Sequence, residues 1–416
     1  MTKRYEIYKD SGVQWLGEIP GHWKRTRLKN VMKLLNGRAY LQPELQEEGK
    51  YRILRVGNFF TNDKWYYSDM ELEPTKYCEK GDLLFAWSAS FGPYIWDEEK
   101  VIYHYHIWKV LLGEKYDKYY AYFMFKAFSE VKRRDVHGST MVHLTLQDMN
   151  QSYIPLPPLS EQHSIVSYLD DKCAKIDKML EGKQKQIELL AEMKQRIIAD
   201  VVTRGLNPNV KMKATNIPWL PEIPEHWSCI KLKAFCKDNK EKNKGNVESC
   251  VLSLSYGNVI VKQNVNFGLV PDNYESYQIV KPGYIILRLT DLQNDHKSLR
   301  TGLVKHRGII TSAYVGLVVN NINNEYVHLL LHSYDVMKVF YGLGGGLRQS
   351  MSYQDISNLY VPVPPLTEQQ DIVSYITDKT SKIDTLTAKL QQEIESIKEY
   401  KQRLISDVVT GQIKVC

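Results

Sequence analysis

Two short stretches of the chain carry residue types that could do chemistry. In "HYHIW", His104 and His106 alternate along a run typical of a β-strand, so both imidazoles would lie on one face and could hold a metal ion. No third ligand stands nearby, and an outward-facing or core role is the simpler interpretation. "GLGGGLRQS", residues 342–350, is rich in glycine but lacks the GK[ST] ending of a phosphate-binding loop. It is either a plain loop or a flexible loop that presents Arg348.

Other catalytic signatures are missing from the sequence. The six cysteines form no CxxC pair and no Cys/His spacing typical of zinc, so we interpret them as isolated reduced thiols. We find no "NPPY"- or "DPPY"-type methyltransferase motif, no DEAD-type helicase box and no PD-(D/E)xK nuclease signature. We therefore expect no cofactor, no metal and no catalytic centre in this chain.

Composition and charge set broad limits on the class of protein. The chain has 416 residues, 43% hydrophobic and 25% charged, which is ordinary for a soluble protein of two or three domains. It has no apolar run near the ~20 residues of a membrane helix, and its start does not resemble a signal peptide, so we expect a cytoplasmic location. The net charge is +7, and the excess lies in two long segments, which weakly favours contact with a polyanion.

The chain repeats itself. "PLPPLSEQHSIVSYLDDKCAKID" begins at Pro155 and "PVPPLTEQQDIVSYITDKTSKID" begins at Pro362, and the similarity continues to "KQRIIADVVTRG" and "KQRLISDVVTGQ". A second repeat precedes each of these, because "WLGEIPGHWKRTRLK" at Trp15 matches "WLPEIPEHWSCIKLK" at Trp219. Between the repeated ends, residues 30–153 and 234–360 show little identity. The pattern indicates a tandem duplication in which the frame is kept and the contents differ.

The segments that begin at Pro155 and Pro362 are predicted to be long helices. Each places an acidic residue, Glu161 or Glu368, in its first turn, where negative charge opposes the helix dipole. Apolar residues then recur every seven positions, the spacing of a coiled-coil seam. The predicted seam residues are Leu169, Ile176, Leu190, Ile197, Ile376, Ile383, Leu390, Ile397 and Leu404. The residues predicted to fill the seam between them are Met179, Leu180, Ile187, Met193, Leu386, Ile394 and Val408, with Lys183 as an interruption.

Each of these helices needs a partner for its apolar stripe. Two tandem copies related by a pseudo-two-fold axis would pack their helices antiparallel. The alternative is that each helix docks on its own domain. The bodies between the helices have short strand-like runs, such as "GDLLFAWSAS" and "KPGYIILRLT", and helix-like runs, such as "KYYAYFMFKAF".

We thus expect a mixed α/β fold with four segments. The predicted divisions are a first body at 1–154, a first long helix at 155–205, a second body at 206–361 and a second long helix at 362–416.

The paired "PPLxEQ" helices, taken with the two "EIPxHW" openings, resemble the specificity subunit of type I restriction–modification systems over essentially the full chain. The resemblance implies two target recognition domains, each reading one half of a bipartite double-stranded DNA target. It implies antiparallel spacer helices that fix the distance between the half-sites. It also implies two methyltransferase (modification) subunits and motor–nuclease (restriction) subunits as partners, with no catalytic centre in the chain itself.

Because the two bodies differ, we expect two unlike half-sites and an asymmetric target. Two alternatives stay open at this point. One is a self-contained DNA methyltransferase or nuclease, against which the missing motifs argue. The other is a coiled-coil adaptor that does not bind DNA.

Candidate DNA-contacting residues are chosen by side-chain chemistry near strand ends and glycine turns. Arg pairs well with guanine, and Asn or Gln pairs with adenine, through two hydrogen bonds each. The candidates are Arg38, Tyr40, Arg55, Asn58, Ser88, Ser90 and His104 in the first body, and Tyr256, Asn258, Arg288, Thr290, Ser312 and Arg348 in the second. Trp23 and Trp227 are expected to pack their domains onto the helices. Arg196 with Asp200 and Arg403 with Asp407 are expected to form ion pairs, and a contact with the modification subunits is the alternative.

Overall fold

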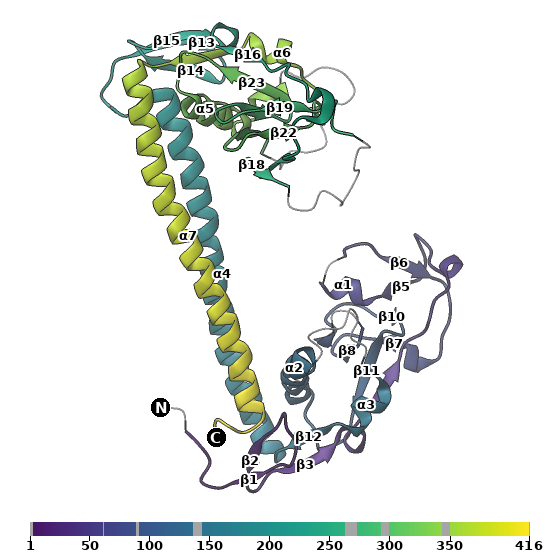
Figure 1. Cartoon of the computed structure of the whole chain (residues 1–416). Coiled ribbons are helices and arrows are strands. Elements are labelled where there is room, and N and C mark those ends of the chain that lie inside the picture. The colour runs from purple at the N-terminus through teal and green to yellow at the C-terminus, as the bar shows by residue number, and fades with distance from the viewer. Residues whose placement is uncertain are drawn as a thin grey trace. The chain divides into compact units, whose positions relative to one another are not determined.

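The computed structural model describes residues 3–60, 62–88, 91–135, 144–262, 273–292, 299–342 and 350–415 (Figure 1). It forms two compact units, each of which contains one body and parts of both long helices. Unit 1 comprises Met1–Lys183 and Gln392–Cys416, and unit 2 comprises Gln184–Gln391. The units therefore cut across the two helices, and the four-part division of the sequence stays a prediction.

Unit 1 is built on two four-stranded sheets. Their strand orders are β6-β5-β10-β7 and β4-β11-β8-β9, and the pairs β1-β2 and β12-β3 flank them. The strands are β1 (Tyr8–Asp10), β2 (Glu18–Pro20), β3 (Lys24–Arg27), β4 (Met32–Asn36), β5 (Tyr51–Leu54), β6 (Tyr66–Ser68), β7 (Tyr77–Cys78), β8 (Leu83–Ala86), β9 (Gly92–Ile95), β10 (Val101–Tyr103), β11 (Ile107–Leu112) and β12 (Tyr153–Leu156). The helices of this body are α1 (Val56–Phe60), α2 (Lys118–Asp135) and α3 (Leu146–Gln151), with 3-10 turns at Leu28–Asn30, Gln42–Glu44 and Pro74–Lys76.

Unit 2 has the same kinds of element around a four-stranded sheet of order β16-β23-β20-β21. Its strands are β13 (Met212–Ile217), β14 (Leu220–Pro224), β15 (Ser228–Lys231), β16 (Cys236–Asp238), β17 (Leu252–Ser255), β18 (Asn258–Val261), β19 (Gln278–Val280), β20 (Ile285–Leu287), β21 (Thr301–Leu303), β22 (Gly308–Ile310), β23 (Val315–Val319) and β24 (Tyr360–Val363). Its helices are α5 (Asn324–Val336) and α6 (Tyr353–Ser357), with 3-10 turns at Leu232–Ala234, Lys244–Asn246 and Val339–Gly342.

The two bodies share a core plan although their sequences differ. In β8, Leu83 and Phe85 pack into the core beneath α2, while Leu84 points into a second cluster on the opposite face. In β20, Ile285 and Leu287 likewise pack beneath α5, and Ile286 joins a second cluster. Side chains alternate between the two faces of a strand, so a central strand buried on both sides needs consecutive apolar residues. The predicted mixed α/β duplication is therefore confirmed.

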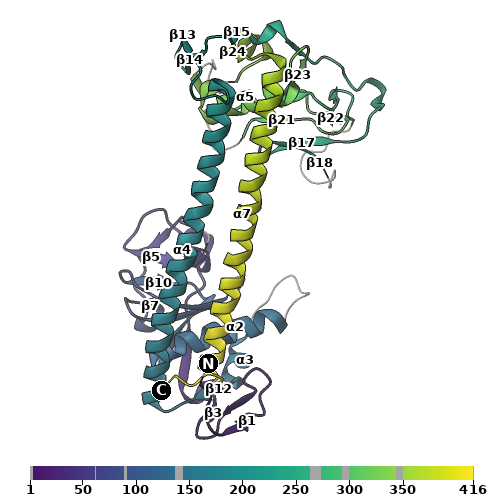
Figure 2. The same cartoon turned by 90° about the vertical axis from the view of Figure 1, so that its left-hand side faces the viewer.

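The two long helices are α4 (Leu159–Arg204) and α7 (Leu366–Val409), of 46 and 44 residues. Within unit 1, the first part of α4 lies beside the last part of α7 (Figure 2), and Lys401 Nζ is 2.6 Å from Asp177 Oδ1. Within unit 2, Lys194 Nζ is 2.6 Å from Asp384 Oδ1. These two ion pairs join equivalent positions of the two copies and require antiparallel packing. Among the described residues, no helix has both the length and the apolar character of a membrane span.

Burial along the helices places the seam. All nine predicted seam residues face inward. Six are buried: Leu169, Ile176, Ile376, Ile383, Leu390 and Leu404. The other three, Leu190, Ile197 and Ile397, are half-buried. Of the residues predicted to fill it, Leu180, Ile187, Ile394 and Val408 also face inward. The prediction is wrong for Met179, Met193 and Leu386, which are about half exposed. Each of these three residues comes three positions after a seam residue, as Met179 does after Ile176. The residues that complete the seam come four positions after one, as Leu180 does.

Each helix also packs on the bodies. In unit 1, Ile165 and Leu169 of α4 and Leu404 and Val408 of α7 join one core with the first body. In unit 2, Val202 of α4 and the first turns of α7 join the core of the second body. The alternative in which each helix docks only on its own domain is therefore wrong, since each helix begins on one body and ends on the other.

Candidate nucleic-acid interface

The repeated motifs meet in a structure that we call the clasp, in which the Glu of "PPLxEQ" contacts the His and Trp of "EIPxHW". In unit 1, Trp23 Nε1 donates to Glu161 Oε2 at 3.0 Å, and His22 Nε2 lies 2.5 Å from Glu161 Oε1. In unit 2, Trp227 Nε1 donates to Glu368 Oε2 at 3.0 Å, and His226 Nε2 lies 2.8 Å from the same oxygen. The motifs thus bind the start of each helix to its body.

The glutamine that follows this glutamate completes the junction. The side chain of Gln162 accepts from the backbone amide of Asp117 at 2.7 Å and donates to the carbonyls of Lys115 and Pro157. Gln369 repeats this arrangement with the amide of Asn323, at 2.9 Å, and the carbonyl of Pro364. Both glutamines are almost fully buried. Their amides satisfy backbone groups that would otherwise be buried without partners.

The end of the opposite helix closes each junction. Tyr120 of α2 donates to the carbonyl of Val409 at 2.9 Å, and Tyr326 of α5 donates to that of Val202 at 3.0 Å. Gly411 then turns the chain at φ +79°, where a Cβ would lie 2.4 Å from Pro20. Only glycine adopts this conformation and fits this contact without strain.

These contacts assign the repeated residues to structure. Trp23 and Trp227 are 0% and 1% exposed, so they cannot stack on bases in this conformation. Arg403 Nε lies 3.4 Å from Asp407 Oδ2, and Arg196 Nε lies 3.6 Å from Asp200 Oδ2, each pair within one helix. Both ion pairs are as expected. The two arginine side chains remain more than 80% exposed, so they are still accessible to a partner.

Four of the predicted residues of the first body lie close together. Arg38 pairs with His104 across a β-bridge, and the rings of Tyr40 and His104 stack at 6.3 Å. Burial lowers the pKa of His104 to about 4, helped by the neighbouring His106 and Arg55. His104 is therefore neutral near pH 7 in the chain without DNA. Tyr40 has a buried hydroxyl with no hydrogen-bond partner among the described residues, and burial raises its pKa.

Other predicted residues of this body are already engaged. Arg38 forms a two-point ion pair with Glu44, at 2.7 and 3.1 Å. The amide of Asn58 accepts from the Arg55 backbone and donates to two carbonyls of the following turn. Ser88 is buried, and Ser90 lies outside the described residues. Their contacts with DNA stay predictions.

The sequence analysis expected His104 and His106 to lie on one face of a strand, and this prediction is wrong. His104 to His106 form the turn between β10 and β11, with the two imidazole centroids 4.9 Å apart. The turn arises because β10 belongs to one sheet and β11 to the other, so the chain must cross between them. Within the described ranges no group of three or more His, Cys, Asp or Glu could hold a metal ion.

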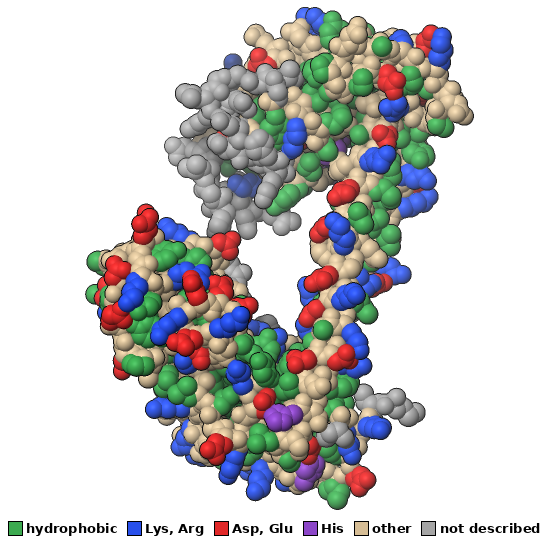
Figure 3. Space-filling model, turned by 180° about the vertical axis from the view of Figure 1, so that it is seen from behind, with side chains coloured by type: hydrophobic (Ala, Val, Ile, Leu, Met, Phe, Trp, Pro, Cys, Tyr) green, Lys and Arg blue, Asp and Glu red, His purple; other side chains and the backbone are tan. Residues whose placement is uncertain are grey.

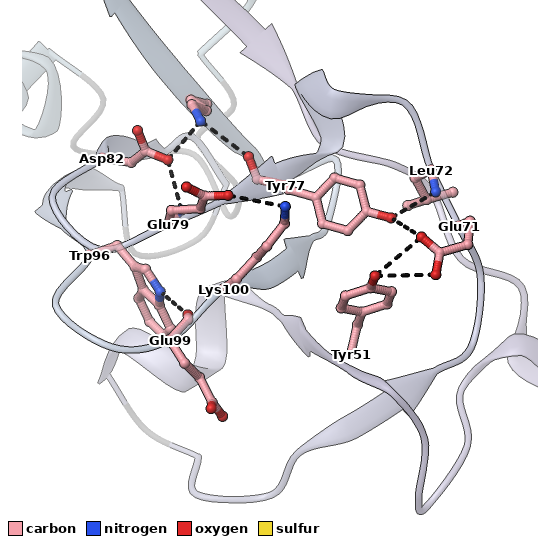
Figure 4. A network of polar contacts seen from close by, with 10 residues as sticks. Tyr51, Glu71, Leu72, Tyr77, Glu79, Asp82, Trp96, Glu99 and Lys100 are labelled. Carbon is pink, nitrogen blue, oxygen red and sulfur yellow. Dashed lines mark hydrogen bonds and ion pairs between the residues drawn. The ribbon is translucent and has the colours of Figure 1, made fainter.

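A group of carboxylates at the edge of the first body also has structural partners (Figure 4). Glu71 accepts from the hydroxyls of Tyr51 and Tyr77, Glu79 lies 3.0 Å from Lys100 Nζ, and Asp82 pairs with a lysine of β11. Each carboxylate thus ties the segment around β7 to a neighbouring strand or to the residue that precedes one. The network resembles neither a paired acid–base site nor a metal site.

In the second body, Tyr256 and Asn258 lie together at the tip of the β17–β18 hairpin. The hairpin forms one wall of a groove with a cavity volume of about 880 Å³, which Lys305 and His306 also line. No carboxylate is among the described residues that line this groove, which suits a polyanion. The sequence analysis missed Lys305 and His306, although the adjacent basic residues of "VKHRG" before a glycine were a usable signal.

The remaining predicted residues lie elsewhere. The backbone carbonyls of Arg288 and Thr290 accept from the buried guanidinium of Arg300, so this segment is held from inside. Ser312 donates to the Ser276 carbonyl and accepts from Lys242. Arg348 lies outside the described residues.

Comparison with known proteins follows this geometry. The type I restriction modification DNA specificity domain matches the chain twice, at residues 20–189 and 228–396. The MjaVIII specificity subunit of a type I restriction enzyme from Methanocaldococcus jannaschii is 24% identical, with 99% of this chain and 98% of that protein covered. The EcoBI specificity subunit from Escherichia coli is 21% identical, with 97% and 89% covered.

A solved structure shares the fold. It comes from work on complex assembly and conformational transition of the type I R-M system, has a TM-score of 0.66 and 13% identity, and covers 94% of this chain and 98% of its own. The two domain matches cover most of the chain and each takes in one clasp glutamate. The protein is therefore a member of the type I restriction–modification DNA specificity family and, like the relatives it matches over nearly its whole length, a type I specificity subunit.

Proposed function

We propose that this chain is the non-catalytic DNA-reading subunit of a cytoplasmic type I restriction–modification complex. Each body reads one half of a bipartite, asymmetric target, and the antiparallel helices set the spacing between the half-sites. One observation carries the proposal: the same clasp occurs twice, while the sequences of the two bodies differ. A constant frame with variable contents suits two different DNA sequences held at a fixed separation, because duplex DNA presents equivalent grooves to equivalent modules.

The helices are proposed to bind two modification subunits, after which restriction subunits complete the complex. Charges of both signs are interspersed along the helix surfaces (Figure 3), which suits contact with protein rather than with phosphate. Exposed apolar residues occur at equivalent positions of the two copies: Met179 and Tyr400 in unit 1, and Leu386 and Met193 in unit 2. The Lys401–Asp177 ion pair sets the register that brings Met179 and Tyr400 to one level. One such pair per unit would accommodate two copies of the same partner.

The test of DNA reading is methylation mapping in cells that hold this chain and its cognate modification subunit. We expect a bipartite motif with two unlike halves. Exchange of residues 30–153 for the equivalent segment of another family member should change one half and leave the other intact. A motif in which both halves change, or an undivided motif, would contradict the modular proposal.

The test of docking is the stoichiometry of the complex. Met179→Asp combined with Tyr400→Asp should reduce the modification subunits bound from two to one, because a charge in an apolar contact is costly to desolvate. Native mass spectrometry of the purified complex measures this number. Leu206→Asp, at an exposed leucine between α4 and β13, is the matched control and should retain two subunits. If the double variant still binds two modification subunits, Met179 and Tyr400 are not part of the docking site.

A further inference from the structure

We propose that the tip of the β17–β18 hairpin is the base-reading element of the second body, with Tyr256 at its apex and Asn258 reading an adenine. This inference rests on the proposed function and specifies how one half-site is recognised. The first observation is that Tyr256 has a backbone conformation that is unfavourable for a tyrosine. Tyr256 has a φ of +46° and is 88% exposed.

The hairpin loop has two residues and a defined geometry. Ser255 pairs with Asn258 across the strands, so Tyr256 and Gly257 form the loop, with φ values of +46° and +76°. Two positive φ values indicate a type I′ turn, for which asparagine followed by glycine is strongly preferred. A tyrosine in the first position is strained, because its Cβ crowds the backbone when φ is positive. Among the described residues, its exposed ring makes no aromatic, cation–π or hydrogen-bond contact that offsets this strain, which indicates selection for something outside the chain.

One face of the β17–β18 hairpin packs on a small hydrophobic core. Leu252 and Val259 are buried in the small core beneath it, with Leu254 packed alongside. Gly302 of β21 lies directly underneath, where a Cβ would come within 2.5 Å of the Leu254 side chain. A rigid two-stranded ribbon is one of the two elements that fit the DNA major groove. The tip is thus presented by a fixed scaffold.

The face of the hairpin that lines the groove carries hydrogen-bonding side chains near the tip. The hydroxyls of Ser253 and Ser255 have no hydrogen-bond partner in the part of the chain that the structure describes, and both line the groove. Asn258 Nδ2 donates one hydrogen bond, 3.2 Å long, to the Tyr256 carbonyl. This bond orients the amide and leaves its oxygen and its second N–H available. Those two groups match the N6–H and N7 of adenine in the major groove.

Basic side chains lie farther back along the groove. Lys305 is exposed and has no carboxylate partner among the described residues, and Lys262 and His306 line the same groove. Such groups contact phosphates and fix the orientation of a reader without specifying sequence. The arrangement therefore separates base contacts at the tip from backbone contacts behind it.

The test uses the full chain in complex with its modification subunit. Exchange of residues 30–153 first identifies which half of the methylated motif belongs to the second body. In that half, Asn258→Ala should relax one adenine position, with discrimination falling on the order of ten- to a hundredfold. Tyr256→Asn should weaken binding to the cognate duplex about tenfold or more, yet leave the melting temperature unchanged or higher, because asparagine suits the turn.

Lys305→Ala should weaken binding to all duplexes and reduce the slope of log affinity against log salt by about one. Lys233→Ala, at an exposed lysine outside the groove, is the control and should leave the slope unchanged. If the wild-type complex gives no bipartite motif, the proposed function fails. If it gives one and both Asn258→Ala and Tyr256→Asn leave it unaltered, the hairpin is not the reader and only this inference fails.

Discussion

Replacing Glu161 with alanine is expected to reduce the free energy of unfolding of unit 1 by about 2–3 kcal/mol, because hydrogen bonds to a charged acceptor are worth that much and their donors remain behind. Glu161 accepts from the hydroxyl of Tyr5 as well as from Trp23 and also contacts His22. Trp23 is fully buried, so its indole N–H would lose its partner without gaining water. Chemical denaturation followed by hydrogen exchange measures the loss and localises it.

Two controls accompany this variant. Glu368→Ala removes the equivalent clasp and should destabilise unit 2 but not unit 1. Glu188→Ala removes an exposed glutamate of α4, whose single ion-pair partner among the described residues is Lys185 at 3.2 Å, and should change stability by less than about 0.5 kcal/mol. If Glu161→Ala matches Glu188→Ala, the clasp does not stabilise unit 1.

The effect of Glu161→Ala should also depend on pH. Although burial opposes it, the hydrogen bonds from Trp23, His22 and Tyr5 hold the pKa of Glu161 below its ordinary value. A carboxylate with a lowered pKa in the folded state stabilises the fold above its unfolded pKa, and this contribution is lost as the pH falls through the folded pKa. The difference between wild type and variant should therefore be full near pH 7 and shrink in acid.

Ile376→Ala is expected to cost about 2–5 kcal/mol, because it leaves a cavity where α7 packs in the core of unit 2. Ile376 is 1% exposed. The control is Leu386→Ala on the same helix, which removes a comparable side chain at 46% exposure and should cost less than about 0.5 kcal/mol. Similar losses in the two variants, measured by denaturant titration, would mean that the seam is not placed as described.

Much of the fold could be predicted from periodicity and repetition. The seven-residue spacing located α4 and α7, and the duplication indicated their antiparallel pairing. The second seam row was predicted only in part, because positions three and four residues after the first row are both apolar at Met179 and Leu180, and spacing alone does not decide between them. Only packing against the other helix selects Leu180.

The site was harder to predict than the frame. Trp23 and Trp227 were correctly predicted to pack their bodies onto the helices, but the buried contacts of Gln162 and Gln369 were not predicted. The turn at His104–His106 was read as strand because its aromatic residues have high strand propensity, and the change of sheet at that point is set by tertiary contacts. The turn at Tyr256 could have been predicted from the sequence, since "SYGN" between alternating apolar residues is typical of a hairpin.

The contact between residues 3 and 414 has a consequence for how the polypeptide could be reconnected. The backbone amide of Lys414 donates to the carbonyl of Lys3 at 2.8 Å, and Tyr8 donates to the carbonyl of Gly411 at 2.9 Å. A short peptide could join residues 3 and 414, and the chain could be opened in the exposed stretch at residues 206–209, outside every described strand and helix. Such a circular permutant would retain both glutamate junctions, so the order of the two halves along the gene is not dictated by the fold.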